Sequence, residues 1–355
     1  MRLPTTLLVA SAAFVLLQIG SCSTSHIPES SNNRTAKSEL DAGNSDRLDE
    51  KDIVDSTPAG ITRYRIPGST ISFEMVTVSG GAFKLGTPAE TEGADEDEAP
   101  QVEVTVDAFM IGRFEVTHDE YALLRYVDRD TDSTAVEGHR MDVDAIARPS
   151  TPYEDPAHGM SGRGFPAVGM TQWGALQYAK WLTEKTGEFF RLPTETEWEL
   201  ACTAGGNADL TESSLRERGW YKGNSGTELK KVGTRSADAL GIHDLLGNAA
   251  EWTLDQYDEA FYESIESTDG FNPWRRPDRL HPRTVRGGAY DDDVSEVRCT
   301  ARMESNLNWK SRDPQIPKSF WWNTDSPFVG FRLVRPLNQP SEDEQVAFWQ
   351  FVLGE

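Results

Sequence analysis

The chain has 355 residues, 37% of them hydrophobic, and a formal net charge of −23. This hydrophobic fraction suffices for a core, and the length suits either two domains or one large domain with extensions. The acidic excess argues against a nucleic-acid partner, because binding to phosphates requires clustered lysine and arginine.

The N-terminal segment predicts export. Arg2 precedes an apolar run over residues 7–17, which is too short to span a bilayer comfortably and is typical of a secretory signal. The small residues just before Cys22 resemble the lipobox of bacterial lipoproteins, in which the cysteine is lipidated. Ordinary cleavage and an uncleaved anchor are the alternatives. We expect a signal peptide over residues 1–22 and a lipoprotein anchored in a membrane of the cell envelope, on its periplasmic or outer-membrane face.

The segment after Cys22 differs in composition from the rest of the chain. Residues 23–60 are rich in Ser, Asn, Asp and Glu and almost free of aromatic residues. Such a composition cannot bury enough apolar surface to fold, so we predict a disordered tether. If Cys22 carries lipid, Cys202 and Cys299 remain, and an even pair in an oxidising compartment is usually a disulfide.

Alternating strand patterns begin near Ile71. Residues 73–78 and 82–85 flank Gly80-Gly81 and predict a hairpin that turns on these glycines. Residues 102–106 and 109–111 form a second set of strands. Residues 128–164 lack periodicity and are interpreted as a long surface insertion.

Helix-start signals recur further along the chain. Thr117, Thr171 and Thr194 each precede a helical pattern, and the first and third carry a glutamate three residues later as in a capping box. A C-terminal helix is predicted within residues 337–355, and it should fold onto its own domain. With few helices, many short strands and no βαβ pattern, we expect an irregular α+β domain.

The stretch 241–252 concentrates residues that can bind a cation. Asp244 and Glu251 offer carboxylates, and a turn at Gly247-Asn248 could point main-chain carbonyls inward, which suits calcium. The alternative is a plain helix start, in which Asn248 caps the helix and Glu251 reaches back to the cap.

Several blocks of sequence occur in an order that resembles the formylglycine-generating enzyme family, the sulfatase-modifying factor domain. They are Leu85-Gly86-Thr87, Asp97-Glu-Ala-Pro100, Val102-Glu-Val-Thr-Val106, Phe114-Glu-Val-Thr-His118, Pro166-Ala-Val168 with Trp173, Arg191-Leu-Pro-Thr-Glu-Thr-Glu-Trp-Glu199, Gly247-Asn-Ala-Ala-Glu-Trp252, Arg286-Gly-Gly-Ala289, Arg298-Cys-Thr-Ala-Arg302 and Gly330-Phe-Arg332. The match covers residues 71–336. It implies one domain with a variant of the C-type-lectin-like fold, low in regular secondary structure.

The same resemblance implies calcium and a disulfide. Its second calcium site matches the side chain of Asp244, the carbonyls of Gly247 and Ala249, and the carboxylate of Glu251. Asn224 and Ser225 resemble the opening of the first calcium site, although the acidic loop that completes that site is shortened here. Cys202 and Cys299 align with a structural disulfide of the family.

The departures from the family concern its chemistry. Known members oxidise a sulfatase cysteine to formylglycine with oxygen and a copper(I) ion held by two cysteines, because thiolates are the ligands that Cu(I) prefers. Here Asp292 stands where the first of these cysteines belongs, and the second is missing. Ala289 replaces the active-site serine, and Ala250 replaces a tryptophan. We therefore assign no catalytic residue and no copper.

Two functional expectations follow from these departures. The first is a non-oxidase member that binds an unknown protein or small-molecule ligand, and the second is an oxidase that works by a variant mechanism. Residues 291–293, with His281, Arg286 and Tyr290, could also form an acid/base cluster, whereas the simpler interpretation is a solvated acidic turn.

Overall fold

The computed structural model describes residues 53–56, 60–126, 129 and 148–354. The predicted signal peptide, Cys22, nearly all of the predicted tether and most of the predicted insertion lie outside these residues. Within them, no helix combines the length and the apolar character needed to cross a membrane.

The strands form three sheets. The bounds are β1 Ile53–Ser56, β2 Ile61–Arg65, β3 Ser72–Val78, β4 Gly81–Leu85, β5 Val102–Val106, β6 Phe109–Gly112, β7 Ala250–Gln256, β8 Arg283–Arg286, β9 Arg302–Glu304, β10 Val329–Gly330 and β11 Val334–Pro336. A five-stranded antiparallel sheet has the order β1-β2-β3-β6-β11, a four-stranded sheet has the order β10-β7-β8-β9, and β4 pairs with β5 alone. The last strand of the chain, β11, therefore lies at one edge of this sheet, and the first described strand, β1, lies at the other edge.

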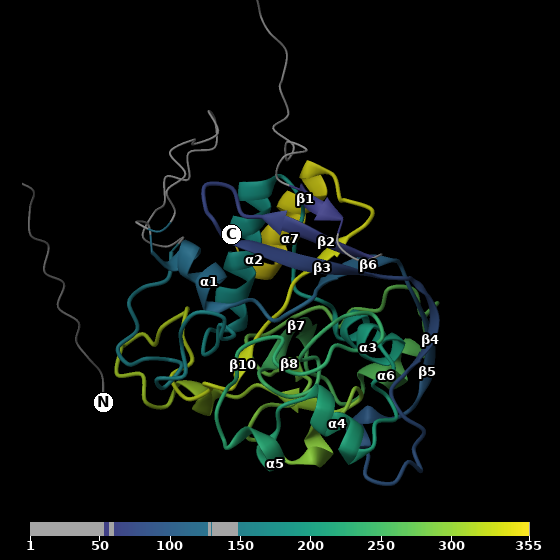
Figure 1. The fold of residues 1–355 in the computed structure, drawn as a ribbon. Coiled ribbons are helices and arrows are strands. Elements are labelled where there is room, and N and C mark those ends of the chain that lie inside the picture. Colours follow the sequence, from purple (N-terminus) through teal and green to yellow (C-terminus); the bar gives the residue numbers. More distant parts are fainter. Residues whose placement is uncertain (1–52, 57–59, 127–128, 130–147, 355) are drawn as a thin grey trace, which may run out of the picture. The chain divides into compact units, whose positions relative to one another are not determined.

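The helices lie beside these sheets (Figure 1). Their bounds are α1 His118–Arg125, α2 Gln172–Thr186, α3 Glu195–Ala204, α4 Glu212–Arg218, α5 Lys222–Ser225, α6 Phe261–Ile265 and α7 Glu342–Leu353, with 3-10 turns at Glu96–Glu98, Val294–Glu296 and Leu307–Lys310. Helix α2 contacts α7, α3 contacts β4, and α6 contacts β5. The predicted irregular α+β fold is confirmed.

The predicted helix starts are also confirmed. The side chains of Thr117, Thr171 and Thr194 each accept a hydrogen bond from the first turn of α1, α2 and α3, and Ser341 does the same for α7. Glu120, Glu197 and Glu344 complete capping boxes. These starts depend on contacts within four residues, so local sequence suffices to predict them.

The predicted hairpin on Gly80-Gly81 is wrong. β3 pairs with β2 and β6, whereas β4 pairs with β5, so the two glycines carry the chain from one sheet to another. A Cβ at Gly80 would lie 2.4 Å from the main-chain nitrogen of Ala108, and this close approach explains the glycine better than a turn does.

One strand falls inside the range predicted as tether. The backbone of residues 53–56 forms β1, which pairs with β2 and covers the edge that β2 would otherwise expose. The prediction of disorder for residues 23–60 therefore extends too far at its C-terminal end.

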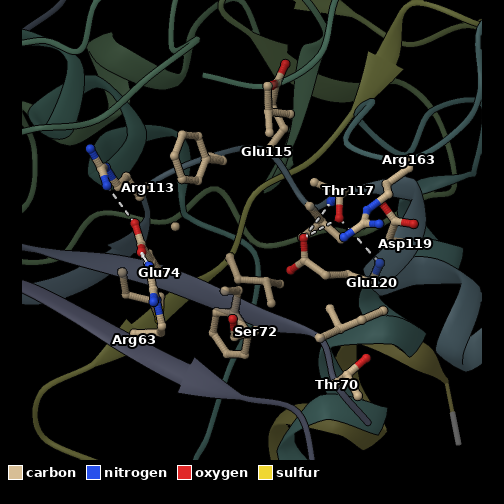
Figure 2. Close-up of a pocket in the computed structure, with 18 residues that line it drawn as sticks. Arg63, Thr70, Ser72, Glu74, Arg113, Glu115, Thr117, Asp119, Glu120 and Arg163 are labelled. Atoms are coloured by element: carbon tan, nitrogen blue, oxygen red, sulfur yellow. Dashed lines mark hydrogen bonds and ion pairs between the residues drawn. The ribbon is translucent and has the colours of Figure 1, made fainter. Parts of the chain in front are cut away.

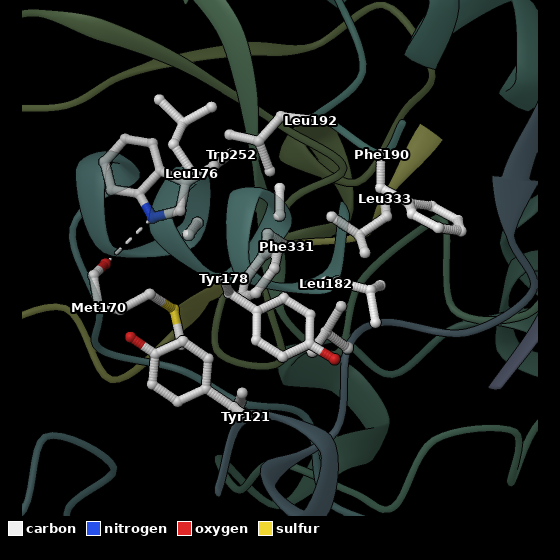
Figure 3. Packing of buried hydrophobic residues seen from close by; sticks show 14 of the residues in the cluster. Tyr121, Met170, Leu176, Tyr178, Leu182, Phe190, Leu192, Trp252, Phe331 and Leu333 are labelled. Atoms are coloured by element: carbon white, nitrogen blue, oxygen red, sulfur yellow. Dashed lines mark hydrogen bonds between the residues drawn. The ribbon is translucent and has the colours of Figure 1, made fainter. Parts of the chain in front are cut away.

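The largest hydrophobic cluster joins α1, α2, β7 and the segment before β11 (Figure 3). The ring of Phe331 packs edge to face against Tyr121 and Tyr178, whose own rings are tilted toward each other, and the three ring centroids lie 5.6 to 6.2 Å apart. The indole nitrogen of Trp252 donates to the carbonyl of Met170 (3.1 Å). This contact fixes the start of β7 against the loop before α2, and the loop 241–252 is thereby held on a rigid support.

Candidate functional site

The turn at Gly247-Asn248 is tightly packed. Gly247 has φ +80°, and a Cβ there would lie 2.1 Å from the carbonyl oxygen of Trp220, so only glycine fits. Asn248 is left-handed (φ 59°), and strand β7 follows it rather than a helix. The helix-start alternative is wrong, because the Asn248 amide bonds across the fold to Glu115 and Lys230 instead of capping the next residues.

Three of the four predicted calcium ligands have free oxygens. The Oδ2 atom of buried Asp244 accepts from the amide of Gly233 (2.6 Å), while its Oδ1 is buried and has no partner among the residues that the structure describes. Within the described part of the chain, no amide donates to the carbonyls of Gly247 or Ala249. A buried oxygen without a donor is costly, and a cation would relieve that cost.

Glu251 is held differently. Its Oε1 accepts from Arg332 Nη2 (2.6 Å), and its Oε2 accepts from Arg332 Nε (2.7 Å) and from the indole nitrogen of Trp198 (2.8 Å). All three side chains are buried. A calcium ion at this position would have to share the Glu251 carboxylate with the arginine.

Sequence reasoning missed Glu115 as a member of this site. Its buried carboxylate accepts from the Ala249 amide (3.0 Å) and from the Asn248 side chain (3.0 and 3.1 Å). Burial, followed by the charges of Asp244 and Glu251, raises the pKa of Glu115 well above its ordinary value. The signal in the sequence was an acidic residue between apolar Phe114 and Val116.

Glu115, Asp244, Glu251 and Arg332 together form what we call the acidic cluster. It contains three carboxylates and a single guanidinium. Burial also raises the pKa of Asp244, to about 6, with Glu251 contributing in the same direction. Among the described residues, no three His, Cys, Asp or Glu side chains are arranged to hold a metal, so a cation here would depend on main-chain carbonyls. Calcium accepts such carbonyls, and the donor set fits it in that sense.

Asn224 and Ser225, the residues predicted to open a further calcium site, are engaged elsewhere. Asn224 accepts from the Tyr221 amide and donates to the Gly219 carbonyl, both at 2.9 Å. Ser225 donates to the carbonyl of Tyr290 (2.6 Å). Ser225 thereby fastens α5 to the turn after β8, and the role of both residues as metal ligands stays a prediction.

The turn after β8 carries the positions where the family resemblance places copper chemistry. The amide of Ala289 donates to Asp292 Oδ2 (2.8 Å), so the aspartate closes the turn on itself. Burial raises the pKa of Asp292 to about 6, and the charge of Asp291 adds to the shift. Ala289 and Ala250 are both buried. At the position where the resemblance places the first copper-binding cysteine, the described chain therefore has the carboxylate of Asp292 and no sulfur ligand.

A second group of ionic side chains, which we call the balanced network, lies beneath that turn. Arg286 donates to Glu195 (2.7 Å) and Glu199 (2.5 Å), and Arg302 donates to Glu195 (2.6 Å). All four side chains are fully buried. Burial alone would raise the pKa of Glu195, yet Arg302 and Arg286 lower it below the ordinary value. The network fixes α3 to β8 and β9.

The proposed acid/base cluster is therefore not assembled. Arg286 belongs to the balanced network, and His281 pairs with the hydroxyl of Ser305 (3.0 Å). Asp291 and Asp293 are exposed, and Asp293 meets Lys222 at 2.9 Å. This geometry supports the interpretation of residues 291–293 as an acidic turn.

The disulfide between Cys202 and Cys299 is confirmed. It joins α3 to the segment after the acidic turn, with 5.6 Å between the Cα atoms and a sequence separation of 97. The Cys299 carbonyl also accepts from Arg286. Neither thiol of this pair is free to hold a copper ion.

Glu115 also lines a cavity of about 770 Å³. Figure 2 shows Arg63, Glu74 and Arg113 at one end and Thr117, Asp119, Glu120 and Arg163 at the other. Glu120 is buried, no base among the described residues pairs with it, and burial raises its pKa to about 7. The cavity is large enough for a ligand, and both of its ends are ionic.

Comparisons with known proteins agree on one family. The model of the sulfatase-modifying factor enzyme 1-like domain matches residues 69–337. The serine/threonine-protein kinase Pkn1 of Chlamydia trachomatis serovar L2 is 28% identical over 249 residues, which are 69% of this chain and 38% of the kinase. The chain thus spans little more than a third of that relative.

Two further relatives are matched over most of their length. The formylglycine-generating enzyme of Mus musculus is 27% identical over 296 residues, covering 69% of this chain and 76% of the enzyme. The chaperone protein LppX of Paenibacillus barcinonensis is 26% identical over 305 residues, covering 70% and 90%. The solved structure of PvdO from Pseudomonas aeruginosa superposes with a TM-score of 0.57 at 23% identity, over 77% of this chain and all of PvdO.

Proposed function

The chain belongs to the family of sulfatase-modifying factor enzyme 1-like domains, and we propose that it is a non-oxidase member that binds a protein or a small-molecule ligand. We further propose that it acts as an exported lipoprotein, held to a membrane of the cell envelope through Cys22.

The acidic turn carries the first proposal. Copper(I) is a soft ion that requires thiolates, and Asp292 offers a hard carboxylate that already accepts from Ala289. The cysteines of the described chain are consumed by the disulfide between Cys202 and Cys299. The residues expected to hold copper therefore do not fit it, and we derive no step through that metal.

The names of the relatives support a binding function in different degrees. LppX, which is matched over 90% of its length, is named a chaperone, and a chaperone acts by binding another protein. The kinase Pkn1 of Chlamydia trachomatis is matched over 38% of its length, so its activity is not part of the proposal.

A structural calcium ion is part of the proposal. Asp244 would supply Oδ1, Gly247 and Ala249 would supply carbonyls, and Glu251 would share its carboxylate with Arg332. Bound calcium would neutralise the excess charge of the acidic cluster and stabilise the turn before β7.

The alternative is a variant oxidase that makes formylglycine without the cysteine pair. Similarity to the mouse formylglycine-generating enzyme favours this alternative function. It would need a copper ligand that the acidic turn does not provide.

One assay separates the two functions. The full-length chain is incubated with a Cys-x-Pro-x-Arg peptide, Cu(I) and oxygen, and the peptide mass is followed. An active formylglycine-generating enzyme serves as the positive control, and a metal-free reaction as the blank. We expect no formylglycine above the blank, and turnover above it would overturn the non-oxidase proposal.

A further inference from the structure

We infer that the cavity beside α1 binds an organic cation, a protonated amine or a guanidinium group, on the carboxylates of Asp119 and Glu120. We call these two side chains the α1 carboxylates. The inference rests on the proposed binding function and names the chemical class of the ligand and the place where its charge lies. It involves neither the acidic turn nor the calcium ligands.

The carboxylates of the cavity outnumber its bases. The charged residues in its lining are four acids and three arginines, namely Glu74, Glu115, Asp119, Glu120, Arg63, Arg113 and Arg163. Two of the arginines, Arg63 and Arg113, bind Glu74. Glu115 accepts from the Asn248 side chain and the Ala249 amide. The negative charge that remains unmatched therefore lies on the α1 carboxylates.

Glu74 and Glu120 show what a base does to a carboxylate in this cavity. Burial alone would raise the pKa of Glu74, but hydrogen bonds from Arg113 and Arg63 hold it below the ordinary value. Glu120 is only 7% exposed, and among the described residues it accepts hydrogen bonds from Thr117 alone. Burial raises its pKa to about 7. Glu120 thus lacks the positive partner that Glu74 has.

One oxygen of each α1 carboxylate is open. Glu120 Oε2 accepts from the Thr117 amide (2.9 Å) and the Thr117 hydroxyl (2.6 Å), and no described residue donates to its Oε1. In Figure 2 that second oxygen carries no dashed line. Asp119 Oδ2 accepts from the Gly164 amide (2.7 Å), and its Oδ1 likewise has no donor in the described chain. A buried carboxylate oxygen without a donor favours a cation beside it.

The bases near α1 do not fill this role. The guanidinium group of Arg125 lies over the ring of Trp322, and that of Arg129 lies over the ring of Tyr126. Neither arginine lines the cavity. Arg163 does line it, but this exposed side chain forms no ion pair with any residue that the structure describes. The described residues therefore leave the α1 carboxylates free to pair with a ligand.

Much of the remaining wall is apolar. Ile71, Phe73, Val116 and Leu333 line the cavity, and its volume of about 770 Å³ lies in the range of ligand sites. An organic cation would bury its aliphatic or aromatic body against this wall while its charge meets the α1 carboxylates. An inorganic ion would leave the apolar wall unused.

Four small probes with the same aliphatic body test this inference on the full-length chain. Butylammonium and butylguanidinium carry the cation, whereas 1-butanol and butyrate are the neutral and anionic counterparts. At pH 8 Glu120 is largely ionised, because its pKa is about 7. By ligand-observed NMR we expect saturable binding of both cations and at least about tenfold weaker binding of the other two, since the α1 carboxylates repel an anion and form no ion pair with an alcohol. No binding of either cation, or equal binding of butanol, would overturn the inference.

Four variants locate the charge. Glu120→Gln should weaken the cations about tenfold and Asp119→Asn about threefold, whereas Glu103→Gln, which removes an exposed carboxylate on β5, should change their affinity by less than about twofold. Arg163→Gln removes a positive charge from the cavity and should strengthen cation binding about twofold. Weaker binding to Arg163→Gln, or unchanged binding to both carboxylate variants, would contradict the inference. Melting temperatures verify folding, and if Glu120→Gln unfolds, the Asp119 and Arg163 variants decide.

Cation binding should also release a proton from Glu120. A positive charge beside this carboxylate lowers its pKa from about 7, so at pH 7 the bound form holds fewer protons than the free form. The other titratable groups around Glu120 are Asp119, Tyr178 and Arg163. Calorimetry with butylguanidinium in two buffers of different ionisation enthalpy should measure roughly half a proton released, and none with Glu120→Gln. A purely structural Glu120 would release no proton in the wild-type protein, which would overturn the inference.

A final pair of probes identifies the source of the cation. A blocked Gly-Gly-Arg-Gly-Gly peptide that binds more tightly than butylguanidinium, and more tightly than its Gln counterpart, would assign the cation to a side chain of a polypeptide. Tighter binding of butylguanidinium would assign it to a small molecule, and both results keep the inference. A negative oxidase assay together with failed cation binding would remove only this inference and leave the non-oxidase proposal standing.

Discussion

The balanced network and the acidic cluster are both buried, yet they differ in how their charge is matched. In the first, Glu195 and Glu199 face Arg286 and Arg302, two acids with two bases. In the second, Arg332 is the one base that the described residues place among three carboxylates, and they offer no donor to Asp244 Oδ1. Helix α3 joins the two, because it carries both glutamates of the first and the Trp198 indole that bonds to Glu251 of the second.

The difference shows how to separate structure from function among buried charges. A network whose charges cancel serves to fix elements to one another, as Arg286 fixes β8 to α3. A cluster with excess charge needs protons or a cation, and the pKa values of Glu115 and Asp244 are raised by burial and by the neighbouring carboxylates. Three measurements bear on this comparison.

The largest effect is expected in the balanced network. Arg286→Met removes one base and leaves Glu195 and Glu199 partly unpaired in the core, so we expect a loss of about 3–5 kcal/mol in the free energy of unfolding. Urea denaturation measures it. Exposed Arg216→Met breaks a surface pair with Glu212 and should cost less than about 1 kcal/mol. Similar losses for the two variants would refute the structural role of the network.

Glu120 represents a third case, a buried carboxylate that no base in the described part of the chain neutralises. Its pKa is raised by burial from 4.5 to about 7, so its folded form holds the proton more tightly than the unfolded chain does. The associated stability is present below pH 4.5 and is lost as the pH rises to 7, by about 3 kcal/mol at roughly 1.4 kcal/mol per pKa unit. Glu120→Gln should lose that part of the pH dependence while keeping the capping box.

A matched control is available at α7. Glu344 occupies the same capping-box position at the surface, and hydrogen bonds from Ser341 lower its pKa. Its contribution is present at neutral pH and is lost as the pH falls, so Glu344→Gln should change the profile at the acidic end. If Glu120→Gln leaves the slope between pH 4.5 and 7 unchanged, the raised pKa is refuted.

The smallest effect concerns calcium at the acidic cluster. Free calcium at ten times its Kd should raise the unfolding free energy by about 1.4 kcal/mol over a chelator-treated sample. Asp244→Ala should abolish this difference, whereas Asp292→Ala, at the acidic turn, should keep it. Thermal melting with and without calcium measures both. An unshifted wild-type protein would remove the site.

The features that sequence predicted well are local ones. Thr117 and Glu120 cap α1 through contacts three residues apart, and the same holds for Thr194 and Ser341. Strand partners were not predictable in this way. β4 finds its partner across the 3-10 turn at Glu96–Glu98, and nothing near Gly80 specifies that choice.

The site was predicted only in part for the same reason. The loop from Asp244 to Glu251 stands out because its donors are close in sequence. Glu115 lies 133 residues before Asn248, and Arg332 lies 81 residues after Glu251, so no local pattern connects them. The disulfide is the exception among distant pairs. It was predictable because few cysteines leave few pairings.

The disulfide also makes the chain's thiol chemistry simple to interpret. The sequence holds three cysteines, and Cys202 and Cys299 are joined. Cys22 is then the one cysteine of the sequence outside the disulfide, and a maleimide reacts with it only if it carries no lipid. The stoichiometry of labelling therefore reports the chemical state of the N-terminal cysteine alone, with no contribution from the folded domain.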